Sequence, residues 1–245
     1  MEIRYYNEYS QCLNRDMDFI VYGHTGIPIL VFPAQDGHCQ DYENFGMVDT
    51  IKDKIEQGLV QLFCVGSVDE ESYSDEMGNP AHRSYILEQF YYHICDEMVP
   101  RIHEINGTGK MIYTTGCSLG ATHAANMMLR RPDLFMGCIG LSGYYDTDLF
   151  FGQYVDENIY NNSPLKYLNG MSSNHPYVDL YNQRKIILCC GQGAWEDEMV
   201  KSTSLMKETF DRLGVHAWTD FWGYDVNHDW DWWRQQLPYF LGHIL

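Results

Sequence analysis

A serine between two glycines stands where an apolar stretch gives way to a run of small residues. Gly116 and Gly120 flank Ser118 in the segment YTTGCSLGAT, residues 113–122, which has the pattern G-x-S-x-G. A serine that exposes its Oγ at a sharp strand-to-helix turn needs a strained backbone, and the residues two positions away must be small to fit against the adjacent strand. The pattern therefore predicts that Ser118 is a nucleophile. Ser142, in LSG, is an alternative that lacks the leading glycine and a small-residue helix.

A serine hydroxyl becomes an effective nucleophile beside a histidine base that a carboxylate orients. Where such a triad is built on this kind of turn, its members follow in the order serine, acid, histidine, each in a loop after a strand. Of the ten histidines, His228 in NHDWDWW lies between the last expected strand and the last expected helix, where that order requires the base. His123, one turn into the helix after the serine, fits packing, while His24 and His38 stand in early loops and could contact a substrate.

The acid is expected after the apolar run KIILCC, in the loop GQGAWEDEMV at residues 191–200. Glu198 falls inside the helix that the following periodicity predicts. Glu196 and Asp197 both stand at the junction of loop and helix, where an acidic residue could also serve as a helix cap. We favour Glu196 over Asp197, but a one-residue change in the loop would exchange them, so the spacing leaves both open.

Two backbone amides are expected to bind the oxyanion of a tetrahedral intermediate. One is the amide that follows the nucleophile, at Leu119. The other comes from the loop after the third expected strand, FPAQDGHCQDY at residues 32–42. Gln35 is the candidate in that loop and Asp36 is the alternative.

Short apolar runs alternate with longer amphipathic stretches along the chain, which is typical of βαβ units. The expected strands are residues 3–9, 17–23, 27–33, 59–67, 110–116, 136–143, 185–191 and 216–223. The expected helices are residues 80–105, 118–131, 196–213 and 229–243, the third of which ends at a Gly214 C-cap. The pattern predicts an α/β fold with a mostly parallel eight-stranded sheet flanked by helices.

Residues 144–184 show little sustained periodicity and are rich in Tyr, Asn, Asp and Gly. Such insertions often cover the active site of an α/β fold, so we expect a partly helical lid or cleft wall within a single domain, residues 1–245. Tyr144, Tyr145 and Trp195 are candidates for contacts with a sugar or aryl group of a substrate.

The formal net charge of −18, from 34 acidic and 16 basic side chains, repels phosphate backbones and anionic lipid. We therefore expect no nucleic-acid or membrane partner and a neutral small-molecule substrate. The first residues, MEIRYYNEYSQ, lack the basic and apolar segments of a secretory signal, which favours a cytoplasmic protein. The eight cysteines form no C-x-x-C pair, which favours buried reduced thiols, and we expect no metal or other cofactor.

With these residues assembled, the chain resembles the esterase-D-like branch of the α/β-hydrolases, which includes S-formylglutathione hydrolases, feruloyl and acetylxylan esterases, and mycolyltransferases. The segments that carry the resemblance are VFPAQDG (31–37), SVDEESYSDE (67–76), GCSLGA (116–121), CIGLSGYYD (138–146) and NHDWDWW (227–233). Pro33 and Ala34 stand where the family usually has His-Gly. The resemblance implies the α/β-hydrolase fold and acyl-ester chemistry, without naming a particular ester.

The sequence thus predicts a serine carboxylesterase that hydrolyses small acyl esters, of carbohydrate or aryl alcohols, through an acyl-serine intermediate. An acyltransferase that uses the same triad is one alternative, because an alcohol replaces water at a single step. A catalytically silent hydrolase fold that serves as a binding module is the other. The oligomeric state is not predicted.

Overall fold

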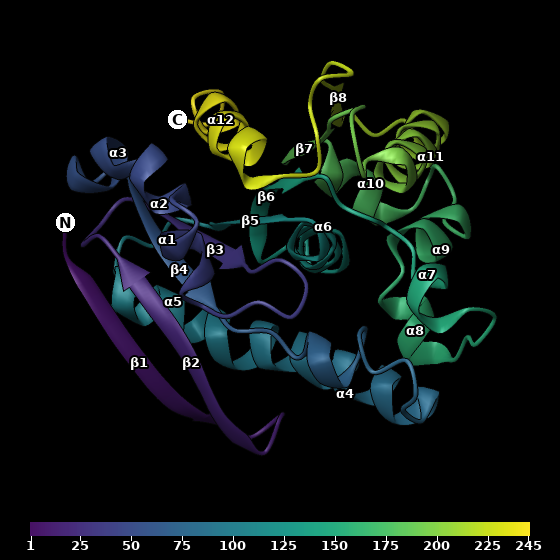
Figure 1. Cartoon of the computed structure of the whole chain (residues 1–245), viewed down its shortest axis with the longest axis horizontal. Coiled ribbons are helices and arrows are strands. Elements are labelled where there is room, and N and C mark those ends of the chain that lie inside the picture. Colours follow the sequence, from purple (N-terminus) through teal and green to yellow (C-terminus); the bar gives the residue numbers. More distant parts are fainter.

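The computed structural model describes residues 1–245 and is built on one eight-stranded sheet (Figure 1). Its strands are β1 (Ile3–Ser10), β2 (Arg15–Tyr22), β3 (Ile27–Phe32), β4 (Val60–Val65), β5 (Ile112–Cys117), β6 (Phe135–Leu141), β7 (Lys185–Cys190) and β8 (Trp218–Phe221). They lie in the order β1-β2-β4-β3-β5-β6-β7-β8, in which β2 pairs antiparallel with β1 and β4 and all other neighbours are parallel. Each strand expected from the apolar runs is present.

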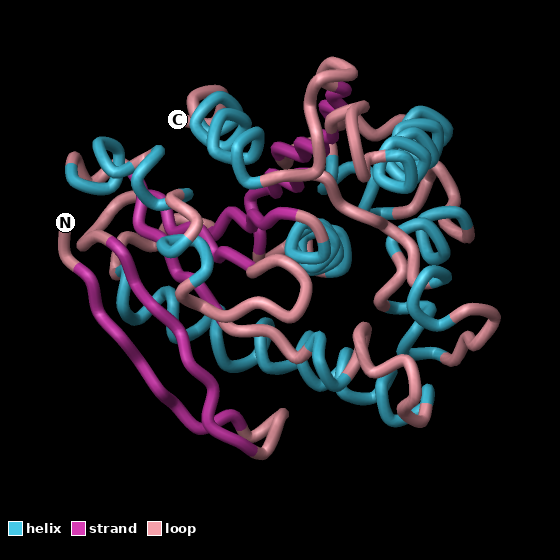
Figure 2. The backbone as a smooth tube through the Cα atoms, in the orientation of Figure 1, coloured by secondary structure: helices cyan, strands magenta, loops and turns pink.

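Helices cover both faces of this sheet. They are α1 (Asp41–Asn44), α2 (Met47–Thr50), α3 (Lys52–Glu56), α4 (Pro80–Tyr92), α5 (Val99–Asn106), α6 (Leu119–Arg130), α7 (Asp148–Phe151), α8 (Glu157–Asn161), α9 (Pro164–Asn169), α10 (Pro176–Tyr181), α11 (Asp197–Leu213) and α12 (Trp230–Leu241). One apolar cluster, with Ile55 and Phe240, packs α1, α2, α3 and α12 on one face, and another, with Phe90 and Phe210, packs α4, α5, α6 and α11 on the other. Figure 2 shows the strands between these layers and the long β1–β2 hairpin at one edge. None of the helices is long and apolar enough to cross a lipid bilayer.

Two glycines allow α6 to lie directly against the sheet. A Cβ atom at Gly120 would stand 2.3 Å from the carbonyl oxygen of Pro33 and 2.5 Å from that of Phe32. A Cβ atom at Gly116 would stand 2.4 Å from the carbonyl carbon of Gly120. Because Ser118 lies between the two glycines, this close approach places the serine at the carboxyl end of β5, beside the loop that follows β3.

The helical segment expected at residues 80–105 is present but is not a regular α-helix throughout. α4 leads through a π-helical turn, His93–Met98, into α5. Pro100 follows this turn and has no N–H to continue the α-helical ladder, which accounts for the interruption. At the other end of the chain, Gly214 ends α11 with φ 73°, the left-handed C-cap that the sequence predicts.

Residues 144–184 form four short helices, α7 to α10, between β6 and β7. A buried ionic group fastens this segment to the helical layer. Arg130 of α6 donates to the two carboxylate oxygens of Glu88 of α4 at 2.7 and 2.9 Å, and the amide group of Asn162 donates to Glu88 at 2.9 Å. The role of the segment as a lid or cleft wall stays a prediction.

The contact between α6 and β3 predicts the effect of a single methyl group. Gly120→Ala should lower the free energy of unfolding by about 1–3 kcal/mol, because the added Cβ must displace the backbone around Pro33. Urea unfolding followed by circular dichroism measures this change. Gly66→Ala is the matched control, since its added Cβ would meet its nearest heavy atom, the carbonyl oxygen of Asp18, at 3.8 Å. Equal loss in both variants would contradict the argument.

Candidate active site

Ser118 occupies the sharp turn between β5 and α6. Its φ of 55° and ψ of −126° lie in a region that residues with side chains rarely adopt, at a cost of about 1–3 kcal/mol. The amide of Ser118 donates to the carbonyl oxygen of Leu141 on β6 at 2.8 Å, which holds the turn against the neighbouring strand. The residue is half-buried. This geometry is the strained turn expected for a nucleophile in the G-x-S-x-G pattern.

His228 lies in the loop between β8 and α12 and faces the serine. Its Nε2 is 2.9 Å from Ser118 Oγ, although the two residues are 110 positions apart in the chain. Nε2 accepts the hydroxyl proton when Nδ1 carries the ring proton. Nδ1 lies 3.5 Å from Oε2 of Glu196, and neither of these two atoms has a hydrogen-bond partner elsewhere. The ring can therefore take a proton from Ser118 on one side while a carboxylate faces its other side.

The side chain of Glu196 points into the protein and is 1% exposed. Its Oε1 accepts a hydrogen bond from Ser142 Oγ at 2.6 Å. The preceding residue, Trp195, has φ 67°, and this left-handed turn sends the indole to solvent and the next side chain inward. Asp197 is exposed and begins α11. Of the two acids that the spacing leaves open, Glu196 is the one that reaches His228.

The loop that carries the acid and the loop that carries the base are joined by hydrogen bonds. The amide of Gly193 donates to the carbonyl oxygen of Val226 at 2.8 Å, and the amide of His228 donates to that of Ala194 at 3.0 Å. In the other direction, the amide of Ala194 donates to the side chain of Asn227 at 2.8 Å. Because these bonds link the two loops at successive residues, the acid and the base keep their separation.

Two backbone amides beside the turn are free to donate. Neither Leu119 nor Gln35 donates its amide to any acceptor among the turns, loops and caps of the chain. Leu119 is the first residue of α6, and the first amides of a helix have no acceptor within it. Gln35 follows β3, where the carbonyl oxygen of Pro33 lies against Gly120 and brings the loop next to the serine. That these amides bind an oxyanion stays a prediction.

Several side chains considered from the sequence are placed away from the reacting atoms. Ser142 is fully buried, so it is not an alternative nucleophile for an external substrate. His123 is also buried, and its Nε2 lies 2.9 Å from Oδ1 of Asp69, which is the packing role expected for it. Tyr145 has no exposed surface, so the expectation that it contacts a sugar or aryl group is wrong. Tyr144 is half-buried.

The chain carries a thiol next to the serine, and it has no cluster of possible metal ligands. Cys117, next to the serine, is fully buried, and burial raises the pKa of its thiol, so it stays protonated. All eight cysteines are free. No group of three or more His, Cys, Asp or Glu side chains is placed to hold a metal ion.

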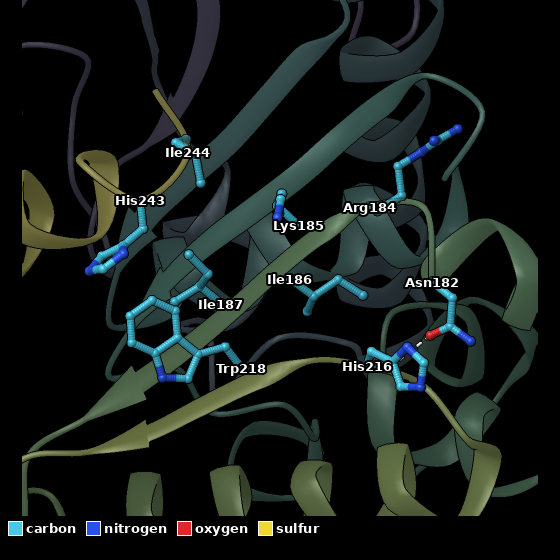
Figure 3. A pocket seen from close by; sticks show the side chains of 9 residues that line it. All are labelled: Asn182, Arg184, Lys185, Ile186, Ile187, His216, Trp218, His243 and Ile244. Atoms are coloured by element: carbon cyan, nitrogen blue, oxygen red, sulfur yellow. Dashed lines mark hydrogen bonds between the residues drawn. The ribbon is translucent and has the colours of Figure 1, made fainter.

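A cavity of about 380 Å³ opens far from these residues, at the amino ends of β7 and β8 (Figure 3). It is lined by Asn182, Arg184, Lys185, Ile186, Ile187, His216, Trp218, His243 and Ile244. Ser118 follows the carboxyl end of a parallel strand, so the cavity and the serine lie at opposite ends of the sheet. The cavity is therefore separate from the candidate active site.

Comparison with known proteins agrees with this geometry. A family model described as "Putative esterase" matches residues 10–244. No curated protein matches the chain. The family resemblance stated from the sequence is confirmed by this match.

Solved structures of similar fold are distant in sequence. A ferulic acid esterase has a TM-score of 0.78 at 14% identity, over 99% of this chain and 97% of its own. An S-formylglutathione hydrolase from Agrobacterium tumefaciens has a TM-score of 0.71 at 12% identity, over 98% of this chain and 93% of its own. MPT51 (FbpC1) from Mycobacterium tuberculosis has a TM-score of 0.71 at 16% identity, over 98% of this chain and 97% of its own. The predicted α/β-hydrolase fold is confirmed.

The placement of the two acids predicts that only one of them matters for catalysis. Glu196→Gln should lower kcat/KM by about 100-fold to 10,000-fold, because a neutral amide neither stabilises an imidazolium nor enforces the reactive tautomer of His228. Steady-state hydrolysis of p-nitrophenyl acetate measures the change. Asp197→Asn removes the same charge from the next, exposed residue and should leave kcat/KM unchanged. A loss confined to Asp197→Asn would refute the assignment of Glu196.

Proposed function

The chain belongs to the esterase family whose model matches residues 10–244, and from this premise we propose that it is a carboxylesterase that hydrolyses small acyl esters through an acyl-serine intermediate. Membership of this family makes the protein a serine ester hydrolase. The observation that carries the finer proposal is the distance of 2.9 Å between Ser118 Oγ and His228 Nε2, with the buried Glu196 facing the other ring nitrogen.

Acylation begins when Ser118 Oγ attacks the carbonyl carbon of the ester and His228 Nε2 takes its proton. The imidazolium that forms faces Glu196, where solvent screening is weak because the carboxylate is 1% exposed. The carbonyl oxygen becomes an oxyanion. The amides of Leu119 and Gln35 are its proposed donors, and their lack of other acceptors supports this role.

The tetrahedral intermediate collapses when the imidazolium gives its proton to the alcohol oxygen and the bond from the acyl carbon to that oxygen breaks. The acyl group then remains on Ser118. A water molecule passes a proton to His228 while its oxygen attacks the acyl carbon. The second collapse returns the proton to Ser118 Oγ and releases the carboxylic acid. Transfer to an alcohol would differ only in the acceptor at this step.

The residue after the nucleophile, Leu119, belongs to a buried apolar cluster. Leu119 packs in a buried cluster with Tyr73, Leu87, Phe151 and Ile159, the last two of which belong to α7 and α8. We therefore assign the segment 144–184 as the wall of the acyl-binding side. We propose that this cluster bounds the acyl-binding side and favours a short acyl chain, because a long chain would have to displace buried side chains.

The alcohol portion of the substrate is proposed to lie on the side of His228. Trp195, 83% exposed, and Tyr224, 82% exposed, stand on the two hydrogen-bonded loops that carry Glu196 and this histidine. Exposed aromatic rings stack well on sugars and aryl groups. The net charge of −18 favours a neutral ester. The cytoplasmic location expected from the sequence stays a prediction.

The proposed triad predicts covalent labelling at one residue. Incubation with a fluorophosphonate should add a single phosphonyl group to Ser118, since only an activated serine attacks phosphorus at neutral pH. Intact-mass spectrometry followed by peptide mapping detects the adduct. His228→Ala should abolish rapid labelling, whereas His216→Ala, a substitution at an exposed histidine at the opposite end of the sheet, should not change it. A folded protein that remains unlabelled would favour the binding-module alternative.

The packed cluster predicts a preference for short acyl chains. For p-nitrophenyl esters, kcat/KM should fall from acetyl to octanoyl, because a long chain must displace the side chains around Leu119. Phe151→Ala opens space in the cluster around Leu119 and should shift the preference toward longer chains. Phe45→Ala, on the face that carries α12, is the control and should leave the preference unchanged. A rate that rises with chain length in the unaltered protein would contradict the proposed acyl side.

A further inference from the structure

Ser142 ends β6 and connects two parts of the site that the sequence does not link. It is fully buried and has φ 57°, a left-handed conformation that is uncommon outside glycine. Its Oγ lies 2.6 Å from Oε1 of Glu196 and 3.0 Å from Nε1 of Trp233. Trp233 belongs to α12 and is 4% exposed. The hydroxyl thus stands between an indole and the carboxylate.

The direction of the two hydrogen bonds follows from the groups themselves. An indole nitrogen can only donate, so Trp233 Nε1–H points at Ser142 Oγ. The serine hydroxyl has a single proton, and an ionised carboxylate can only accept. Ser142 therefore donates to Glu196, and the donors form a chain from Trp233 through Ser142 to the carboxylate.

This chain of donors leaves one oxygen of the Glu196 carboxylate free to face His228. Oε1 of Glu196 accepts from Ser142 and, at 3.3 Å, from the amide of Gly191. Oε2 has no hydrogen-bond partner and faces His228 Nδ1 at 3.5 Å. With Oε1 held by two donors, the carboxylate cannot rotate without losing both hydrogen bonds. The donors to Oε1 therefore fix the orientation that presents Oε2 to His228.

Trp233 also touches the base. Its ring and the imidazole of His228 meet edge to face, with centroids 4.9 Å apart and an interplanar angle of 86°. One side chain of α12 therefore contacts His228 through its ring and reaches Glu196 through its N–H and Ser142.

The backbone conformation of Ser142 does not by itself favour a serine, which indicates that the hydroxyl group has a role. A non-glycine residue at this φ costs about 1–3 kcal/mol, a cost that glycine avoids. Glycine, however, cannot donate to the carboxylate. A serine therefore stands at a position where the backbone conformation alone favours glycine.

We propose that Ser142 and Trp233 are positioning residues, which act as a donor chain that orients the Glu196 carboxylate toward His228. This inference rests on the proposed function of Ser118, His228 and Glu196. Neither positioning residue touches the substrate or the reacting atoms.

Other titratable groups around the carboxylate do not substitute for these donors. Tyr145, in the segment after β6, and Cys189 and Cys190, in β7, face Glu196. Burial raises the pKa of all three, that of Cys190 to about 12. They stay protonated through the pH range in which a histidine base works. None of them has a hydrogen bond to the carboxylate.

The decisive variant is Ser142→Gly, because it removes the hydroxyl and relieves the backbone strain together. If Ser142 serves only the turn, this variant should equal the unaltered protein or exceed it. We expect instead that kcat/KM and the rate of fluorophosphonate labelling of Ser118 fall by about 10-fold to 100-fold, since a hydrogen bond to a charged group is lost. KM should change little.

The pH dependence separates positioning from a structural role. Loss of a donor destabilises the carboxylate beside a neutral imidazole more than the same carboxylate beside an imidazolium. The imidazolium form should therefore persist to higher pH, and the acidic limb of the kcat/KM profile should move to higher pH. A variant that is merely less stable would lose activity without this shift. An acidic limb that stays in place would overturn the proposal.

Trp233→Phe tests the other end of the donor chain. It also serves as the test of the proposal if Ser142→Gly does not fold. It keeps a ring against His228 and removes the N–H, so it should lower the labelling rate in the same direction. In the Ser142→Gly background it should have much less effect, because the N–H acts through the serine. Trp222→Phe, which removes an indole hydrogen bond to Asp220 at 3.2 Å, is the matched control.

The outcomes distinguish the two proposals. If Ser118 of the unaltered protein is not labelled, the proposed function fails and this inference fails with it. If Ser118 is labelled and Ser142→Gly matches the unaltered protein in rate and in pH profile, the proposed function stands and the positioning role alone is refuted.

Discussion

A carboxylate that is 1% exposed, that of Glu196, is the constraint around which the candidate site is organised. An unpaired carboxylate in a protein interior costs several kcal/mol, so a buried carboxylate is found where polar groups face it. Here the polar groups that face it come from three places in the chain. Ser142 at the end of β6 and Gly191 after β7 donate to Oε1, and His228 after β8 places its Nδ1 3.5 Å from Oε2. They converge because β6, β7 and β8 are parallel neighbours and end at one edge of the sheet.

The two sides of Ser118 are held by contacts of different kinds. Directional hydrogen bonds fix the side that carries acid and base, where distances decide whether a proton moves. Apolar packing forms the other side, and it is fastened by Arg83, whose guanidinium donates to the carbonyl oxygens of Tyr73 and Phe150, each at 2.9 Å. Apolar packing tolerates exchange of side chains of similar volume better than a hydrogen-bonded network does. The proposed acyl side could therefore change its shape while the side proposed for proton transfer keeps its geometry.

Secondary structure could be predicted where a pattern is long enough to repeat. The apolar runs of β3 and β7 and the periodic face of α11 have such patterns, and Gly214 supplies a clear end. The helices α7 to α10 have only four to six residues, which is too short for a helical period to show. The expectation that Tyr145 contacts a substrate is wrong for a related reason. Its burial depends on packing beneath the loop after β6, and no local pattern reports that packing.

The sequence by itself determined the order of the candidate nucleophile, acid and base, the alternation that builds the sheet, and the small residues that let α6 approach it, because these follow from neighbouring residues. Only the tertiary structure decided between Glu196 and Asp197, since the left-handed turn at Trp195 selects which of the two faces inward. It also joined Ser142 to Glu196, 54 positions away, and to Trp233, 91 positions away. Contacts across such separations depend on how whole loops and helices pack against the sheet, and the residues between them carry no local signal of that packing.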